Sequence, residues 1–124
     1  MRVIIQRVKE ASVTIDNEIV GKCGYGYLLL VGFTHTDDEF IVDKMVDKVL
    51  QLRINEDEFG KTNLNLEAKN GQILSISQFT LYANCKEGRR PSFVDAMNPN
   101  EASRLYDLFN AKLIEKCSHV ETGV

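Results

Sequence analysis

The residues best suited to chemistry lie in one short segment, 75–82, which mixes hydroxyl, amide and apolar side chains. In a regular strand Ser77 and Phe79 share one face, and Gln78 and Thr80 share the other, because side chains alternate. Two polar groups would then project together where the strand runs into a loop. Such groups can bind or attack a substrate. Thr and Ser are also common on solvated strands, so a plain solvated face is the alternative interpretation.

A loop rich in cations follows this segment directly. Its charged and conformationally special residues are Lys86, Arg89, Arg90, Pro91, Ser92 and Phe93. Arg and Lys side chains contact nucleic-acid phosphates without reading the base sequence, so the loop is a candidate phosphate-binding arm. A charged, solvated loop with no ligand is the alternative interpretation.

Histidine and cysteine give no sign of a metal centre. His35 and His119 are the only histidines, and Cys117 stands two residues before His119. No second pair completes a four-ligand zinc site, and neither histidine lies in a segment that also offers a nucleophile elbow. The glycines between residues 21 and 26 match neither a dinucleotide-binding fingerprint nor a P-loop. The sequence therefore predicts no metal and no cofactor.

Short strands are expected to position these groups. Alternating apolar residues and turn signals predict strands over 2–8, 11–15, 18–23, 27–33, 51–54, 72–82 and 118–124. Asp16–Asn17 has the composition of a two-residue hairpin turn. The polar segment 55–71 is predicted to be a loop. Arg7 lies inside the first, otherwise apolar, strand, so its guanidinium must reach water or pair with an acceptor across the sheet.

Two amphipathic helices complete the pattern. The first is predicted to begin at a capping box, Thr36–Glu39, with apolar residues recurring between 41 and 50 at a helical period. The second begins after the cap Asn98, with Pro99 at its first position. Its apolar stripe consists of Leu105, Phe109 and Leu113. This order predicts an α+β fold with a curled, barrel-like, mostly antiparallel sheet and helices on one side.

Composition limits the class of protein. A chain of 124 residues and 14.0 kDa fits a single domain, 1–124. Its net charge of −3 argues against a protein held to nucleic acid by charge alone, although a local patch can still bind RNA. Three cysteines without paired spacing argue against a disulfide framework. No apolar run approaches the ~20 residues that cross a bilayer, and no signal peptide is recognisable, so we expect a cytoplasmic protein.

Taken together, the segments resemble the D-aminoacyl-tRNA deacylase family, first described as D-tyrosyl-tRNA deacylase. The resemblance rests, in order along the chain, on residues 1–8, 11–13, 24–32, 77–81 and 90–93. It implies a homodimer with a curled, barrel-like β fold, two helices and the active site at the dimer interface. It also implies hydrolysis of D-aminoacyl-tRNA and, in some members, of glycine mischarged on alanine tRNA. Aminoacylated tRNA is the implied partner, whereas DNA, a membrane and a cofactor are not.

The resemblance assigns roles to particular residues. Ser77, Gln78, Phe79 and Thr80 would line the pocket for the aminoacyl end, with Thr80 a candidate nucleophile. The resemblance also implies a mechanism in which the 2′-hydroxyl of the RNA assists, with the protein main chain fixing the substrate. An aminoacyl ester is already activated, so positioning a water and stabilising the oxyanion are sufficient help. Arg7 would brace the chirality-selecting motif of the partner subunit. From their charge alone, we expect Lys86, Arg89 and Arg90 to hold the acceptor stem.

The chain departs from the family at its end. Family members continue beyond Thr122–Gly123 into an Asn-x-Gly-Pro segment with a cis Gly–Pro bond, whose carbonyl groups exclude L-amino acids from the neighbouring subunit's pocket. The given sequence stops at Val124 without this segment. We expect the native protein to be longer. A short form with impaired chiral selection is the alternative.

Two other classes of protein stay open from the sequence. A non-catalytic relative would keep the cationic loop and bind tRNA without turnover. A structural dimer would show neither binding nor turnover. Release of amino acid from D-aminoacyl-tRNA distinguishes the enzyme from both.

Overall fold

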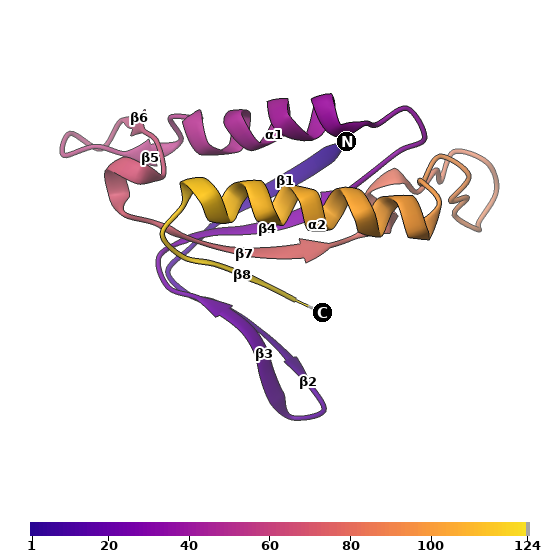
Figure 1. The fold of residues 1–124 in the computed structure, drawn as a ribbon, viewed down its shortest axis with the longest axis horizontal. Coiled ribbons are helices and arrows are strands. Elements are labelled where there is room, and N and C mark those ends of the chain that lie inside the picture. Colours follow the sequence, from indigo (N-terminus) through magenta and orange to yellow (C-terminus); the bar gives the residue numbers. More distant parts are fainter. Residues whose placement is uncertain (124) are drawn as a thin grey trace.

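Two helices cover one face of a four-stranded sheet in the computed structural model, which describes residues 1–123 (Figure 1). The strand order is β1 (Arg2–Val8), β4 (Gly26–Gly32), β7 (Gln72–Ser77) and β8 (Val120–Thr122). β1 pairs with β4 antiparallel, whereas β4 with β7 and β7 with β8 are parallel pairs. The helices form part of the two crossover connections that parallel neighbours require.

Two small hairpins extend from this sheet. β2 (Ala11–Ile15) and β3 (Glu18–Cys23) project away from the helices (Figure 1). Their turn residues Asp16 and Asn17 have φ values of 50° and 66°, as a primed hairpin turn requires. The second hairpin joins β5 (Asn55–Glu56) to β6 (Thr62–Leu64). The expected α+β fold is confirmed, with antiparallel pairing in three of five strand pairs; the sheet is curled but does not close into a barrel.

The first helix begins later than the capping box predicted. α1 spans Glu39–Gln51, and its cap is Asp38, whose Oδ1 accepts a hydrogen bond from the Ile41 N–H at 3.0 Å. Thr36 cannot serve as the cap because a separate turn precedes the helix, closed by the Asp37 N–H on the Thr34 carbonyl at 3.0 Å. The strand predicted over 51–54 is also wrong, since strand pairing begins only at Asn55. The expected loop 55–71 instead contains β5, β6 and a 3₁₀ turn, η1 (Glu67–Lys69).

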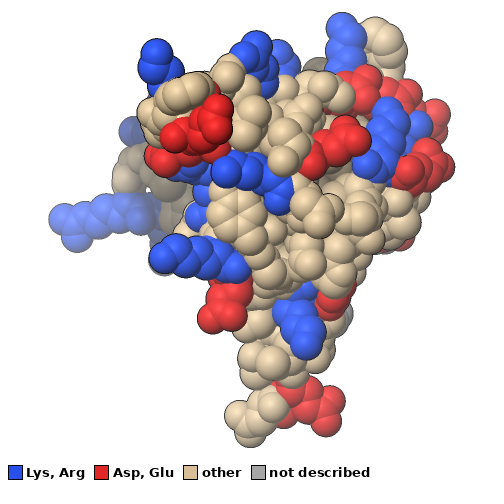
Figure 2. Space-filling model, turned by 90° about the vertical axis from the view of Figure 1, so that its left-hand side faces the viewer, with Lys and Arg blue, Asp and Glu red and all other residues tan. Residues whose placement is uncertain are grey.

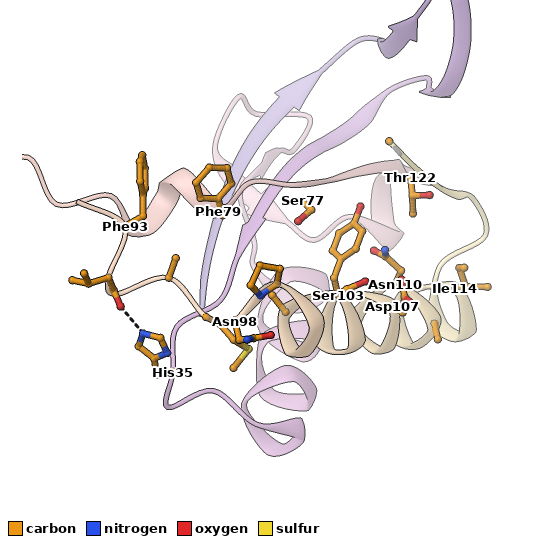
Figure 3. Close-up of a pocket in the computed structure, with 18 residues that line it drawn as sticks. His35, Ser77, Phe79, Phe93, Asn98, Ser103, Asp107, Asn110, Ile114 and Thr122 are labelled. Atoms are coloured by element: carbon orange, nitrogen blue, oxygen red, sulfur yellow. Dashed lines mark hydrogen bonds between the residues drawn. The ribbon is translucent and has the colours of Figure 1, made fainter. Parts of the chain in front are cut away.

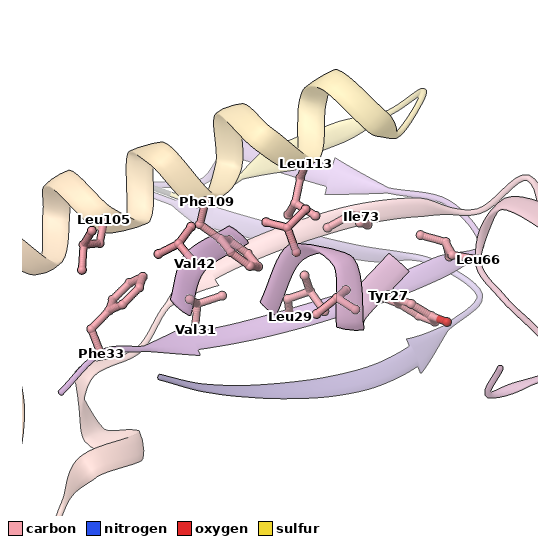
Figure 4. Close-up of a cluster of buried hydrophobic side chains, with 12 residues drawn as sticks. Tyr27, Leu29, Val31, Phe33, Val42, Leu66, Ile73, Leu105, Phe109 and Leu113 are labelled. Atoms are coloured by element: carbon pink, nitrogen blue, oxygen red, sulfur yellow. The ribbon is translucent and has the colours of Figure 1, made fainter. Parts of the chain in front are cut away.

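The second helix follows its sequence signals. α2 spans Pro99–Lys116, and the Asn98 side chain accepts a hydrogen bond from the Asn100 N–H at 2.9 Å. Both predicted helix stripes are confirmed, because they bury against β4 and β7 in one core (Figure 4). Fully buried members of this core are Tyr27, Leu29, Val31, Val42, Val46, Val49, Leu66, Ile73, Leu105, Phe109 and Leu113.

The strand predicted over 72–82 ends early. β7 stops at Ser77, and a 3₁₀ turn, η2 (Phe79–Tyr82), follows. The neighbouring strand β4 ends at Gly32, so the chain has no pairing partner beyond Gln78, whose N–H donates to the Val31 carbonyl at 2.8 Å. The turn packs closely on Gly32, where an added Cβ would lie 2.9 Å from the Gln78 oxygen. Strand periodicity therefore does not describe the segment that contains the candidate site.

Two further expectations concern the rest of the chain. The last predicted strand is present as β8, whereas Val124 lies outside the described residues. Within residues 1–123, neither helix has the length and apolar character that a membrane span needs.

Candidate active site

A groove of about 1070 Å³ opens between η2, the loop 93–99 and one face of α2 (Figure 3). Phe79 and Phe93 stand at one end of the groove, and Ile114 and Thr122 stand at the other. Ser77 lies between them, at the end of β7. Ser77, Phe79 and Phe93 from the predicted site therefore line this groove.

Gln78 and Thr80 do not line the groove, but their side chains lie together. Gln78 Nε2 donates a hydrogen bond to Thr80 Oγ1. The sequence predicted this proximity from strand alternation, whereas the structure produces it by the η2 turn. The first N–H groups of such a turn have no partner within it, so they are available as donors beside the groove.

An aromatic contact joins the two segments that carry the sequence signals. The rings of Phe79 and Phe93 meet edge to face, with centroids 5.1 Å apart. Behind Phe93, the chain is fixed by the Met97 N–H, which donates to the Phe33 carbonyl at 3.0 Å, and by the Ala96 bridge to Thr34. Residues far apart in the sequence thus form one wall of the groove.

The cationic loop, residues 84–92, is closed at its base next to this wall. Asn84 and Ser92 exchange backbone hydrogen bonds of 2.7 and 2.8 Å, and Gly88 takes a left-handed φ of 69° within the loop. Residues 85–91 are all exposed, including the cations Lys86, Arg89 and Arg90 and the acidic Glu87, and Ser92 is half-buried at the base. Across residues 1–123, no ion pair within 4.0 Å involves these three cations. Their charge is free for a ligand.

Arg7 lies away from the groove. Along the sheet it pairs with Tyr27, whereas Ser77 is level with Val31 and Val3. Four residues of strand separate these positions, roughly 13 Å. Arg7 Nη1 donates to the Ile54 carbonyl at 3.1 Å, so the guanidinium pairs with an acceptor in the segment between α1 and β5 and not across the sheet. Figure 2 views the molecule from this side, where Lys and Arg side chains are interspersed with Asp and Glu.

Sequence reasoning missed the polar residues of α2 that line the groove. Tyr106 Oη donates to the Ser75 carbonyl at 2.8 Å. Asn110 is only 6% exposed, and among residues 1–123 its Oδ1 has no hydrogen-bond partner; buried Ser75 Oγ also lacks one there. The spacing by four residues, which places Tyr106, Asn110 and Ile114 on one helix face, was the signal available in the sequence. Buried polar groups without partners are rare, and of these two residues Asn110 lines the groove.

Histidines and cysteines take ordinary structural roles. His35 Nε2 is hydrogen-bonded to the Val94 carbonyl, and His119 Nε2 lies 2.8 Å from the Glu121 carboxylate. Cys117 Sγ contacts the Gly71 and His119 carbonyls, and all three cysteines are free thiols. In the described part of the chain, no three His, Cys, Asp or Glu side chains come together as metal ligands.

Known proteins resemble this chain over nearly its whole length. A family model described as D-Tyr-tRNA(Tyr) deacylase matches residues 4–124. A D-aminoacyl-tRNA deacylase of Brevibacillus brevis is 55% identical over 123 residues, which cover 99% of this chain and 85% of the relative. The Lactobacillus gasseri protein of the same name is 57% identical, with the same two shares covered.

Two solved structures share the fold. One, titled c-Myc DNA Unwinding Element Binding Protein, has a TM-score of 0.93 and 34% identity, covering 100% of this chain and 85% of that one. The other, a probable eukaryotic D-amino acid tRNA deacylase, has a TM-score of 0.77 at 19% identity over 90% of this chain and 65% of that one. Since the family match spans nearly the whole chain and the bacterial relatives exceed half identity, this chain belongs to the D-Tyr-tRNA(Tyr) deacylase family.

Proposed function

We propose that the protein hydrolyses the ester bond of D-aminoacyl-tRNA, releasing the free D-amino acid and the tRNA. The observation that carries this proposal is the family match, with Ser77 and Phe79 lining the groove of about 1070 Å³. Relatives above half identity over 99% of the chain bear the name D-aminoacyl-tRNA deacylase. Glycine mischarged on alanine tRNA is a further proposed substrate.

The aminoacyl end would enter the groove beside Ser77 and the edge-to-face pair Phe79–Phe93. A water oxygen bonds to the carbonyl carbon, the bond to the ribose 3′ oxygen breaks, and that oxygen takes a proton. Backbone N–H groups at the start of η2 would stabilise the oxyanion. Two side chains in the groove lining, His35 and Asp107, are of a type that can act as a base, and His35 Nε2 is already bound to the Val94 carbonyl. The 2′-hydroxyl of the tRNA, which is adjacent to the ester, would assist the attack in place of a protein base.

Thr80 is better suited to positioning than to attack. A hydroxyl nucleophile needs an adjacent base. Thr80 Oγ1 instead accepts a hydrogen bond from the Gln78 amide, which removes no proton from the hydroxyl. The pair of side chains would fix the η2 backbone that faces the ester.

The loop of Lys86, Arg89 and Arg90 would hold the acceptor stem of the tRNA. These cations form no ion pair within residues 1–123, and the loop ends at Ser92, next to Phe93 in the groove wall. Phosphate contacts of this kind set the position of a nucleic acid rather than its sequence. Pro91, Ser92 and Phe93 would orient the loop.

We propose a homodimer whose groove is completed at the interface. The sheet face opposite the helices carries apolar side chains: Leu28 and Leu30 point there, because they alternate with buried core residues. Ile4, paired with Leu30, is 50% exposed, and Ile19 on the projecting hairpin is 62% exposed. Exposed apolar surface of this extent is typical of association sites. Arg7, on the edge strand beside this face, would brace the site of the partner.

Localisation is proposed to be cytoplasmic, where charged tRNA is found. Duplex DNA is not a proposed partner, although one structural relative carries a DNA-binding title. The net charge of −3 gives no general attraction to duplex DNA.

Deacylation of matched D-Tyr-tRNA and L-Tyr-tRNA tests the proposal. We expect release of D-Tyr by the wild-type protein and about a hundredfold loss in Gln78→Ala, from misplaced oxyanion donors. Thr62→Ala, an exposed change on β6, is the matched control and should keep full activity. Folded protein that shifts tRNA in a gel without turnover would identify a binding relative. Protein that neither shifts tRNA nor hydrolyses it would identify a structural dimer, and a shift with duplex DNA would overturn the choice of partner.

A further inference from the structure

The first two residues of the chain are connected to the two segments that frame the groove, the loop 93–99 and η2. The Met1 ammonium lies 2.6 Å from Asp37 Oδ1, and Asp37 Oδ2 accepts the Thr34 N–H at 2.7 Å. Thr34 in turn bridges Ala96, in the wall of the groove. The second residue, Arg2, reaches in the other direction, to η2.

The Arg2 side chain extends past Gly32, at the end of the sheet, to the η2 turn. In the β1–β4 register Arg2 lies opposite Gly32, which leaves room for the η2 turn to approach. The guanidinium Nη1 donates to the Leu81 carbonyl at 2.6 Å. The same group stands 4.4 Å from the centroid of the Tyr82 ring. Both contacts fall on the last two residues of η2.

These contacts provide partners for the end of the short η2 turn. The final carbonyl groups of a helical turn have no partner within it, and a charged donor forms a stronger hydrogen bond than a neutral one. A cation over an aromatic face adds attraction. Tyr82 is only 9% exposed, so its ring is fixed against the protein body. Burial raises the pKa of Tyr82, and the negative charge of nearby Asp37 raises this pKa further. The positive charge of Arg2, over the ring, lowers it.

We propose that Arg2 is a positioning residue for the η2 turn and, through it, for the residues Ser77–Thr80. This inference rests on the proposed function for its kinetic consequence. Arg2 does not line the groove, so it would act on the rate by fixing the backbone next to the substrate rather than by touching it. Small misplacements of such a backbone reduce the rate strongly.

Arg2→Ala and Arg2→Lys test the proposal, with Arg53→Ala as the matched control. Arg53 also donates to a backbone carbonyl, that of Asn63 at 2.7 Å, but at the opposite end of the sheet. We expect Arg2→Ala to lower kcat for D-Tyr-tRNA about tenfold with KM within about twofold, the signature of lost alignment. Arg2→Lys keeps the charge and one donor and should recover most of kcat. Arg53→Ala should leave kcat unchanged.

A second measurement separates this inference from the proposed function. Amide hydrogen exchange of residues 79–83 should be about tenfold faster in Arg2→Ala than in wild type, and unchanged in Arg53→Ala. Equal exchange and equal kcat in Arg2→Ala and wild type would overturn the positioning role. Inactive wild-type protein with the expected difference in exchange would reject the proposed function and keep the role of Arg2 in ordering the turn.

Discussion

The β5–β6 hairpin and the groove differ in what their polar side chains do. In the hairpin, the Asp57 carboxylate accepts hydrogen bonds from the N–H groups of Phe59 and Lys61, at 2.9 and 3.0 Å, and from Asn63. Within residues 1–123, buried oxygens without a partner occur in both regions, Asn55 Oδ1 in the hairpin and Asn110 Oδ1 at the groove. The hairpin uses Asp57 to close its own turn, whereas Asn110 lines the groove and has no such role.

The same contrast holds for cations. Arg53 and Arg7, at the β5–β6 end, both donate to backbone carbonyls of neighbouring segments. Arg89 and Arg90 are exposed beside the groove and form no ion pair in the described chain. The presence of a cation therefore does not by itself indicate a binding site. A cation is a candidate ligand contact when it is not already hydrogen-bonded or ion-paired within the protein. The following substitutions test that distinction, beginning with the largest expected effect.

Asn55→Ala should destabilise the fold without touching the chemistry. Asn55 is fully buried, and its Nδ2 donates to Tyr27 Oη at 2.8 Å and to the Leu64 carbonyl at 3.3 Å. Its loss leaves a buried hydroxyl with no donor, so we expect the free energy of unfolding to fall by about 2 kcal/mol in urea titration. Activity per folded molecule should not change. The control Asn65→Ala removes a half-buried amide that accepts only the Ala68 N–H, and should cost less.

Thr80→Val should lower kcat without affecting stability. Valine keeps the branched shape and removes only the oxygen that accepts the Gln78 hydrogen bond. If Thr80 positions the turn, kcat for D-Tyr-tRNA should fall about tenfold in single-turnover measurements. A fall of about ten-thousandfold would instead identify the hydroxyl as the nucleophile. Thr62→Val, exposed on β6, is the control and should match wild type.

The double change Arg89→Ala with Arg90→Ala should weaken tRNA binding about tenfold and lower the dependence of affinity on salt. A gel-shift titration at several salt concentrations measures both quantities. The control removes two lysines, Lys44 and Lys48, from the exposed side of α1 and should have little effect. Equal weakening by both double variants would mean that net charge, and not this loop, attracts tRNA.

Asp57→Ala should have the smallest effect, and the effect should depend on pH. Hydrogen bonds, chiefly from the Lys61 N–H, hold the pKa of Asp57 below its ordinary value of 3.8. A depressed pKa means that the carboxylate stabilises the fold above the unfolded-state pKa and loses this contribution as pH falls through the folded-state pKa. The melting temperatures of wild type and variant should differ slightly near about pH 7 and converge below about pH 3. A difference that persists in acid would show that Asp57 acts without its charge.

Local signals in the sequence accounted for both helices, for most of the strands and for the membership of the family. The stripe of α2 and its Asn98–Pro99 start came from spacing and capping chemistry, which depend on neighbours along the chain. The Asp16–Asn17 turn came from the left-handed conformations those residues tolerate. The order of short motifs identified the family, and the match over residues 4–124 confirmed it.

Only the tertiary structure decided how these pieces make a groove. Parallel pairing of β7 between β4 and β8, and the end of β7 at Ser77, depend on where distant strands begin and end. The contact of Phe79 with Phe93 and the unpaired Asn110 depend on the packing of α2 across the sheet. Alternation along a single strand specifies which side chains share a face, but not which segment lies opposite them, because that choice is made by long-range packing.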